Sequence, residues 1–262
     1  MKNVLRCSAG ECHKITNQLR LSIYSNVIDL SISNLNRSSK LIPLRVTTKL
    51  KRIPFVTGLL ILFNGYAFFK EAFLGKDLND FICRFAVIPA RYLDFSNFQI
   101  HDLLDKNVAV VVSLFLHAGW FHLISNMWYL WVFGGNVEDK FGHFRFVFAY
   151  ILCGVIGNFA HIFMNTHLEV GAIGASGCIA GVLGAYFILF PKAKVVSLLP
   201  IFIFWTLADV PVFFFLGIWF MIQFFYGFLK LPGSSSCIAW WAHIGGFICG
   251  AVLAHMFIKR KV

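Results

Sequence analysis

A serine and a histidine that could carry out acyl transfer lie inside strongly apolar stretches of the sequence, Ser176 and His243. Polar side chains are costly within a membrane, so each one raises a functional question. Counting about 1.5 Å per residue from Lys192 and Lys259, both side chains lie roughly 24 Å from one surface. A hydrocarbon core is about 30 Å thick. The two residues therefore share one layer and could act as nucleophile and general base if their helices touch.

Small residues predict that the helices do touch. Gly177 and Gly181 follow the serine, and Gly246 and Gly250 follow the histidine at helical spacing. Glycines four residues apart let helix backbones approach closely, although the same spacing also occurs in helix packing without catalysis.

The segment Gly174-Ala175-Ser176-Gly177 is expected at the start of a helix. Free backbone N–H groups and the positive end of the helix dipole would then lie beside an attacked carbonyl. Residue 178 is Cys, so the segment is not the GxSxG elbow of soluble hydrolases.

Two further polar residues, His122 and Asn126, lie four apart and share one helix face at the same depth. An imidazole and an amide facing the serine would be suitable oxyanion donors, whereas either one alone would indicate an interhelical hydrogen bond.

His117 and His122 lack an HExxH pattern and a carboxylate at their depth, so we expect no metal and no cofactor. Asp209 stands alone, which excludes a paired-aspartate protease.

Composition excludes a soluble protein. Of 262 residues, 58% are hydrophobic and only 13% are charged, and the mean hydropathy is +0.74. The formal net charge of +11 does not indicate nucleic acid, because the basic residues flank apolar runs and form no groove. Seven cysteines without a CxxC pair predict neither a zinc ribbon nor a disulfide framework.

An all-α membrane protein with six transmembrane helices is the expected architecture, since a span needs roughly 20 apolar residues. The apolar runs are 54–75, 118–137, 144–165, 174–191, 208–229 and 238–258.

The basic residues predict the orientation of these spans. A basic tail, 1–52, precedes the membrane domain, 53–262, and 17 of the 23 Lys and Arg fall on the same side as this tail. Both termini are thus expected in the cytoplasm. The first external connection, 76–107, should lie on the outer leaflet, and 195–205 along the inner interface. No cleaved secretory signal is evident, but the basic tail with its several serines is compatible with an organelle presequence.

In order and spacing, His117-x4-His122-x3-Asn126, then GASG at 174–177, then Ala242-His243-x2-Gly246-x3-Gly250 resembles the rhomboid family of intramembrane serine proteases. The resemblance covers 53–258. It implies Ser176 as nucleophile and His243 as base in a dyad without a carboxylate. It also implies that His122, Asn126 and the Ser176 backbone N–H hold the oxyanion.

The resemblance further implies transmembrane substrates, here single-span membrane proteins, that reach the site laterally past the fifth helix and a cap at 230–236. Many relatives have an aromatic residue four after the serine, but this chain has Ala180. A Phe or Trp from elsewhere could replace its contact with His243. The six-span form is similar to simple bacterial members of the family and suggests a prokaryotic plasma membrane. Besides its substrates, we expect the protein to contact the lipid bilayer and not nucleic acid.

Two other classes remain in view. A non-catalytic rhomboid-like binder of membrane helices would be signalled by loss of the dyad, which is present. A transporter would show internal repeats and charges near the midplane, which are not evident.

Several other residues are expected to have structural roles. Trp219 and Gln223 share one face of the fifth helix and could border a gate, but packing is their expected role. We expect helix–helix hydrogen bonds for Asn158 and His161, and an inner-surface pair of Glu138 with Arg145.

Overall fold

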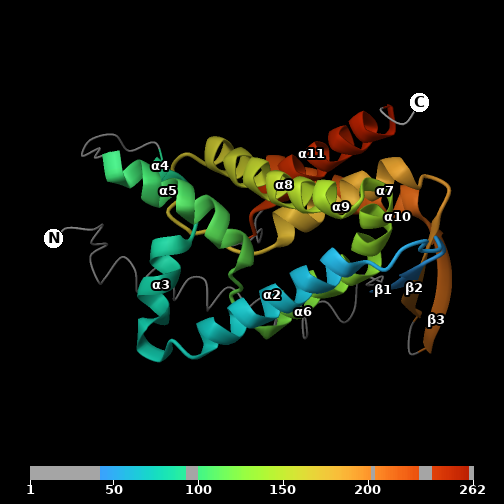
Figure 1. Ribbon diagram of the computed structural model, residues 1–262, viewed down its shortest axis with the longest axis horizontal. Coiled ribbons are helices and arrows are strands. Elements are labelled where there is room, and N and C mark those ends of the chain that lie inside the picture. Colours follow the sequence, from blue (N-terminus) through green and yellow to red (C-terminus); the bar gives the residue numbers. More distant parts are fainter. Residues whose placement is uncertain (1–41, 93–99, 202–203, 230–237, 260–262) are drawn as a thin grey trace.

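A computed structural model describes residues 42–92, 100–201, 204–229 and 238–259, so most of the expected tail lies outside the described residues. Helices dominate the fold (Figure 1). The α-helices are α2 (Phe55–Ala72), α3 (Leu78–Phe85), α4 (Pro89–Tyr92), α5 (Ile100–Val112), α6 (Trp120–Tyr129), α7 (Gly135–Phe141), α8 (His143–Met164), α9 (Ser176–Leu189), α10 (Val212–Leu229) and α11 (Trp240–Lys259). The shorter turns are the 3-10 helices η1 (Gly75–Asp77) and η2 (Ser113–Phe115) and the π-helical turn η3 (Leu130–Gly134).

All six segments expected to cross the membrane form helices. Three of them, α8, α10 and α11, are long and apolar enough to span a membrane by themselves. A fourth candidate is the pair Leu104–Phe115 and Trp120–Phe141, which bends by 78°. The 14-residue α9 is apolar but shorter. The chain is therefore a helical membrane protein with three or four candidate spans by these criteria, and six crossings stay a prediction.

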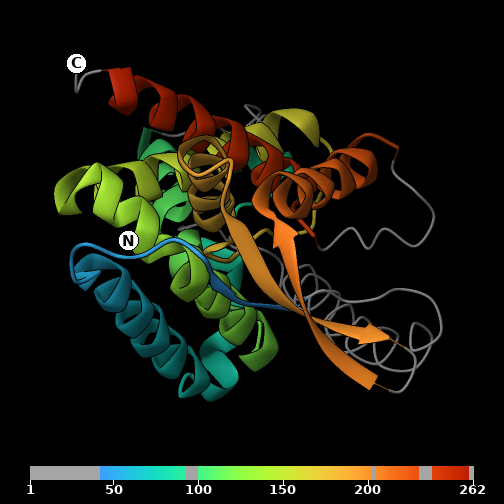
Figure 2. The same ribbon diagram turned by 90° about the vertical axis from the view of Figure 1, so that its right-hand side faces the viewer.

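A small sheet, which the sequence did not predict, accompanies the mostly helical fold. Strands β2 (Lys194–Ile201) and β3 (Phe204–Pro211) form an antiparallel hairpin, with Val195 opposite Val210, and β1 (Ile42–Val46) pairs with the other edge of β2. Figure 2 shows this hairpin twisting away from the helices. The run 194–211 is rich in β-branched and aromatic residues, which favour strands, and this explains why 208–211 do not join α10.

Residues 42–46, near the end of the expected tail, form strand β1 and contact the rest of the described structure. The indole nitrogen of Trp128 donates to the Pro43 carbonyl at 2.6 Å, and the hydroxyls of Thr48 and Tyr186 lie 2.8 Å apart. The end of the basic segment is thus held against α6 and α9.

The two ends of the bundle differ in structure. The sheet lies at the end where α2 begins, and the short helices α3, α4 and α5 lie at the opposite end (Figure 1). These short helices occupy much of the connection expected on the outer leaflet. Their contact with a membrane surface stays a prediction.

The packing of α9 against α11 positions the reactive residues. A Cβ added at Gly250 would overlap the Gly181 carbonyl oxygen, and one at Gly246 would overlap the carbonyl oxygen of Gly177. A Cβ at Gly184 would similarly overlap the Phe247 carbonyl oxygen. The two backbones are therefore in direct contact, as the glycine spacing predicted.

Glu138 fixes the start of α2 instead of pairing with Arg145, which corrects that prediction. Its carboxylate is 1% exposed and accepts hydrogen bonds from the backbone N–H groups of Val56 at 2.9 Å and Thr57 at 2.7 Å, and from the Thr57 hydroxyl at 2.7 Å. The His143 Nδ1 lies 2.6 Å away. Two of the unpaired N–H groups that every helix start exposes are thereby satisfied, and a negative charge faces the positive end of the dipole.

We expect Gly250→Ala to destabilise the protein by about 1–3 kcal/mol or more, because a methyl group cannot fit between the two backbones. The loss should appear in an unfolding titration with SDS in mixed micelles. Gly217→Ala in α10 is the matched control, since no atom lies within 4 Å of its added Cβ. A glycine-to-alanine change in an open helical position should be neutral or slightly stabilising. Equal effects of the two substitutions would contradict the packing argument.

We also expect Glu138→Gln to lower the free energy of unfolding by roughly 2–3 kcal/mol, because an amide NH₂ would face backbone donors and the charge would be lost. The same titration measures it. Asp139→Asn is the control, because this neighbouring carboxylate makes an exposed hydrogen bond of 3.1 Å to the Lys51 N–H. That change should cost less than about 0.5 kcal/mol. A Glu138→Gln protein as stable as the control would refute the capping role.

Candidate active site

Ser176 is the first residue of α9, and the turn before it requires a glycine. Gly174 has a φ of 127°, a conformation that other residues rarely adopt. Its N–H donates to the Ser113 carbonyl oxygen at 2.8 Å. The turn places the serine at the amino end of the helix, where backbone N–H groups lack helical partners.

His243 meets the serine across the glycine contact between α9 and α11. The distance between its Nε2 and the Ser176 Oγ is 2.8 Å, within hydrogen-bonding range. Both residues are only partly buried. The sequence predicted that these two residues would come together, and the structure brings them together. An imidazole nitrogen at this distance can remove the serine proton as the hydroxyl attacks a carbonyl.

The other two expected site residues, His122 and Asn126, project from α6 toward the same turn. A Cβ added to Gly174 would lie 2.9 Å from the His122 Nε2 and 3.8 Å from the Asn126 Nδ2. The Asn126 amide is buried, and its Nδ2 has no hydrogen-bond partner within the described part of the chain. Buried donors are almost always paired, so a free one beside a nucleophile is available for an oxygen that develops charge there.

The His117 ring packs on that of His122, with 5.2 Å between the ring centroids. The backbone N–H of His117 donates to the carboxylate of Glu71, at 3.1 Å from one oxygen and 3.3 Å from the other. Glu71 is buried at the end of α2. This contact fixes the chain just before α6 and so the position of His122.

Asn158 in α8 supports the serine turn from behind, and its predicted role in a helix–helix hydrogen bond is confirmed. Its Nδ2 donates to the Val110 carbonyl oxygen at 2.9 Å and to the Ser113 hydroxyl at 3.1 Å. Ser113 in turn accepts the N–H of Gly174. The His161 ring, by contrast, contacts the side chain of Asn165, the residue that follows the end of α8, at 3.3 Å.

The aromatic contact missing at Ala180 is supplied by other helices, as the sequence suggested. Trp219 of α10 lies with its ring centroid 5.9 Å from that of His243, and Trp240 of α11 lies at 6.3 Å. Two indole rings therefore contact the imidazole, Trp219 in a tilted arrangement and Trp240 edge to face.

Gln223 is a site residue that the sequence argument missed. Its Oε1 lies 2.7 Å from the His243 Nδ1, on the side of the ring opposite the serine. The packing role assigned to it from the sequence is thus incomplete. Its one signal was being a polar side chain in the otherwise apolar α10, four residues after Trp219.

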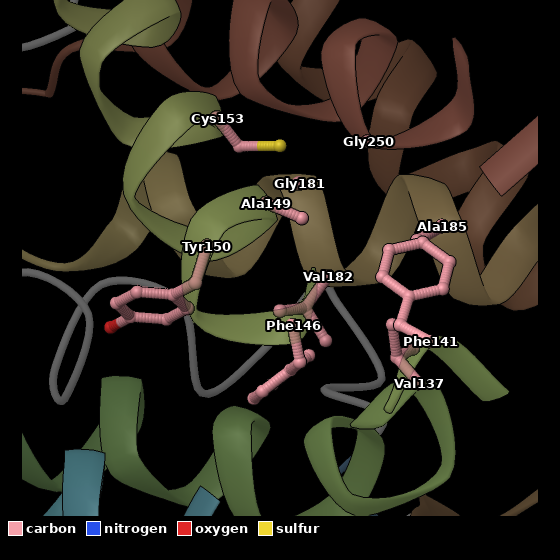
Figure 3. Close-up of a pocket in the computed structure, with 10 residues that line it drawn as sticks. All are labelled: Val137, Phe141, Phe146, Ala149, Tyr150, Cys153, Gly181, Val182, Ala185 and Gly250. Atoms are coloured by element: carbon pink, nitrogen blue, oxygen red, sulfur yellow. The ribbon is translucent and has the colours of Figure 1, made fainter. Parts of the chain in front are cut away.

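The small cavity in Figure 3 lies apart from these groups. Its lining is apolar and comes from α7, α8, α9 and α11, including Tyr150, Cys153 and Gly250. It has room for about one water molecule. We read it as a packing gap behind the glycine contact.

Comparison with known proteins gives an independent result. Residues 105–260 match the family model of the Rhomboid domain. The chain is 31% identical to RHOMBOID-like protein 4 of Arabidopsis thaliana over 157 residues, which are 60% of this chain and 35% of that protein. It is 34% identical to the mouse mitochondrial presenilin-associated rhomboid-like protein over 98 residues, 36% of this chain and 26% of that protein. For the yeast mitochondrial Rhomboid protein 1 the identity is 30% over 98 residues, 36% of this chain and 28% of that protein.

The matches thus span less than half of each relative's length. These relatives come from a plant and from mitochondria, so they do not support the expected prokaryotic plasma membrane. The matched range includes Ser176, His243, His122, Asn126 and Gln223. Because the family model covers more than half of the sequence, the chain belongs to the rhomboid family.

Proposed function

We propose that the chain is an intramembrane serine endopeptidase with Ser176 as nucleophile and His243 as general base. The observation that carries the proposal is the 2.8 Å contact between the Ser176 Oγ and the His243 Nε2. Family membership adds support, since the proposed residues lie in the matched range.

The proposed reaction has two steps. His243 takes the serine proton as the Oγ attacks a peptide carbonyl, and the oxygen of that carbonyl becomes negative. His122, Asn126 and the Ser176 N–H donate to this oxyanion. The protonated imidazole then gives its proton to the amine as the peptide C–N bond breaks. Water attacks the remaining acyl-enzyme ester, again with His243 as base, and releases Ser176 and a carboxylic acid.

The proposed substrates are single-span membrane proteins. The nucleophile lies at the start of α9, among apolar helices, so a substrate must bring its carbonyl into the bundle. A helix end rich in small or helix-destabilising residues would unwind most easily into the extended form that Ser176 can attack. Access is proposed past α10 and residues 230–236, of which the latter lie outside the described chain.

The proposed topology has six crossings, formed by α2, α6 to α7, α8, α9, α10 and α11, with both termini in the cytoplasm. Its support is that α2 begins and α11 ends at the end of the bundle that holds the sheet (Figure 1). Lys192, Lys194 and Lys259 belong to the same end, as the distribution of basic residues requires.

Labelling by a fluorescent fluorophosphonate tests the dyad in the full chain in detergent. Wild type should be labelled, and Ser176→Ala and His243→Ala should abolish labelling, because the serine is nucleophilic only when its proton can be removed. Ser197→Ala is the control, because this buried serine donates to the Val195 carbonyl oxygen at 3.5 Å, and its loss should change nothing. Wild type that labels no more than Ser176→Ala would refute the protease and favour a non-catalytic binder of membrane helices.

Removal of one oxyanion donor should slow the chemistry and leave binding unchanged. We expect Asn126→Ala to lower kcat for a quenched fluorescent transmembrane peptide by about 10²–10³-fold, with little change in KM. Asn165→Ala is the control, because its amide donates to the His161 carbonyl at 3.1 Å at the carboxyl end of α8. A kcat for Asn126→Ala within threefold of wild type would remove this residue from the oxyanion site.

A further inference from the structure

Gln223 lies where a third member of the catalytic group would lie, and this inference rests on the proposed function. Its Oε1 is 2.7 Å from the His243 Nδ1, while the Nε2 of the same ring is 2.8 Å from the serine oxygen. Ser176, His243 and Gln223 thus form one continuous line of hydrogen bonds across three helices, α9, α11 and α10.

The orientation of the Gln223 amide is determined by a second hydrogen bond. Its Nε2 donates to the Trp219 carbonyl oxygen at 3.3 Å within α10. The amide oxygen, which can only accept, therefore faces the imidazole. A neutral imidazole has one N–H, so His243 must carry its proton on Nδ1. Its Nε2 is then an unprotonated acceptor, the form that a base for Ser176 requires.

Helix packing holds Gln223 in this place. Trp219, Gln223 and Gly227 follow at intervals of four and lie on one face of α10. Trp219 packs on the His243 ring, and a Cβ at Gly227 would lie 3.2 Å from the Ile244 Cδ1 and 3.4 Å from the Trp240 Cβ. This face is therefore the one in contact with α11.

Burial makes the contact between the amide and the imidazole energetically important. Gln223 is 5% exposed and sits in an otherwise apolar helix. A buried amide costs free energy unless its polar atoms are paired. Both of its polar atoms have partners, and one of the two is the imidazole.

We propose that Gln223 is a positioning residue that sets the tautomer and the ring orientation of His243. It does the work that a carboxylate does in a Ser-His-Asp triad, without adding a charge inside the membrane. When His243 takes the serine proton, Nδ1–H carries part of the positive charge and the amide oxygen faces it. Trp219 alone could restrict the ring plane, but it cannot select which nitrogen holds the proton.

Two variants of Gln223 distinguish the effect of its hydrogen-bond acceptor from the effect of its side-chain volume. Gln223→Met keeps a similar volume without an acceptor, whereas Gln223→Glu keeps an oxygen at the same place. For the quenched transmembrane peptide we expect Gln223→Met to lower kcat about 10- to 100-fold with KM unchanged, less than the roughly 10²–10⁴-fold that a whole general base contributes. Fluorophosphonate labelling should slow in parallel. Gln223→Glu should retain most of the wild-type rate. Ile222→Met, on the exposed face of the same helix, is the control and should change neither rate.

The tautomer can be read without any activity, from nitrogen NMR spectra of the full chain in detergent with ¹⁵N-labelled histidine. Wild type should show His243 protonated on Nδ1, and Gln223→Met should lose this signature. The inference is overturned if Gln223→Met keeps the signature, if its kcat stays within threefold of wild type, or if Gln223→Glu falls as far as Gln223→Met. An inactive wild type that shows the signature would refute the proposed protease and leave the positioning role intact.

Discussion

The direct backbone contact between α9 and α11 is the constraint on which the site depends. Packed helices usually lie 8–10 Å apart because side chains separate them. Here Gly181, Gly246 and Gly250 remove those side chains, and the carbonyl oxygens of one helix fill the space. A serine side chain is too short to reach a partner on a helix held at a wider separation. The closeness of the helices thus makes the 2.8 Å contact of Ser176 with His243 possible.

A second constraint is that polar groups in an apolar bundle must be paired unless they have another use. Glu138 is paired with the first turn of α2, and Asn158 is paired with Val110 and Ser113. The Asn126 Nδ2 beside the serine turn is buried and unpaired within the described residues. The Glu138 and Asn158 side chains are thus held by structural hydrogen bonds, whereas the Asn126 donor beside the Ser176 turn is not.

The sequence was sufficient to predict contacts that follow from helical spacing or from a shared depth in the membrane. Ser176, His243, His122 and Asn126 could be brought together because each lies on a helix and helical spacing converts position into depth. The role of Gln223 was missed because it depends on which face of α10 contacts α11. That face is set by the packing of Trp219 and Gly227 against α11, which helical spacing alone does not predict. The sheet was missed because a run of β-branched and aromatic residues fits an interfacial segment as well as a strand. The predicted partner of Glu138 was wrong because the prediction considered only charged side chains, whereas backbone N–H groups can also pair with a carboxylate.

The four helices around the site are held by different forces. Helix α9 is fixed to α11 through backbone contact, and α6 is anchored near its start by Glu71 and at Trp128 by β1. Helix α10 touches α11 through indole and phenyl rings and one side-chain hydrogen bond. Because Gln223 belongs to α10 while Ser176 and His243 belong to α9 and α11, the Ser176–His243 contact depends on the glycine packing and the orientation of the imidazole depends on α10.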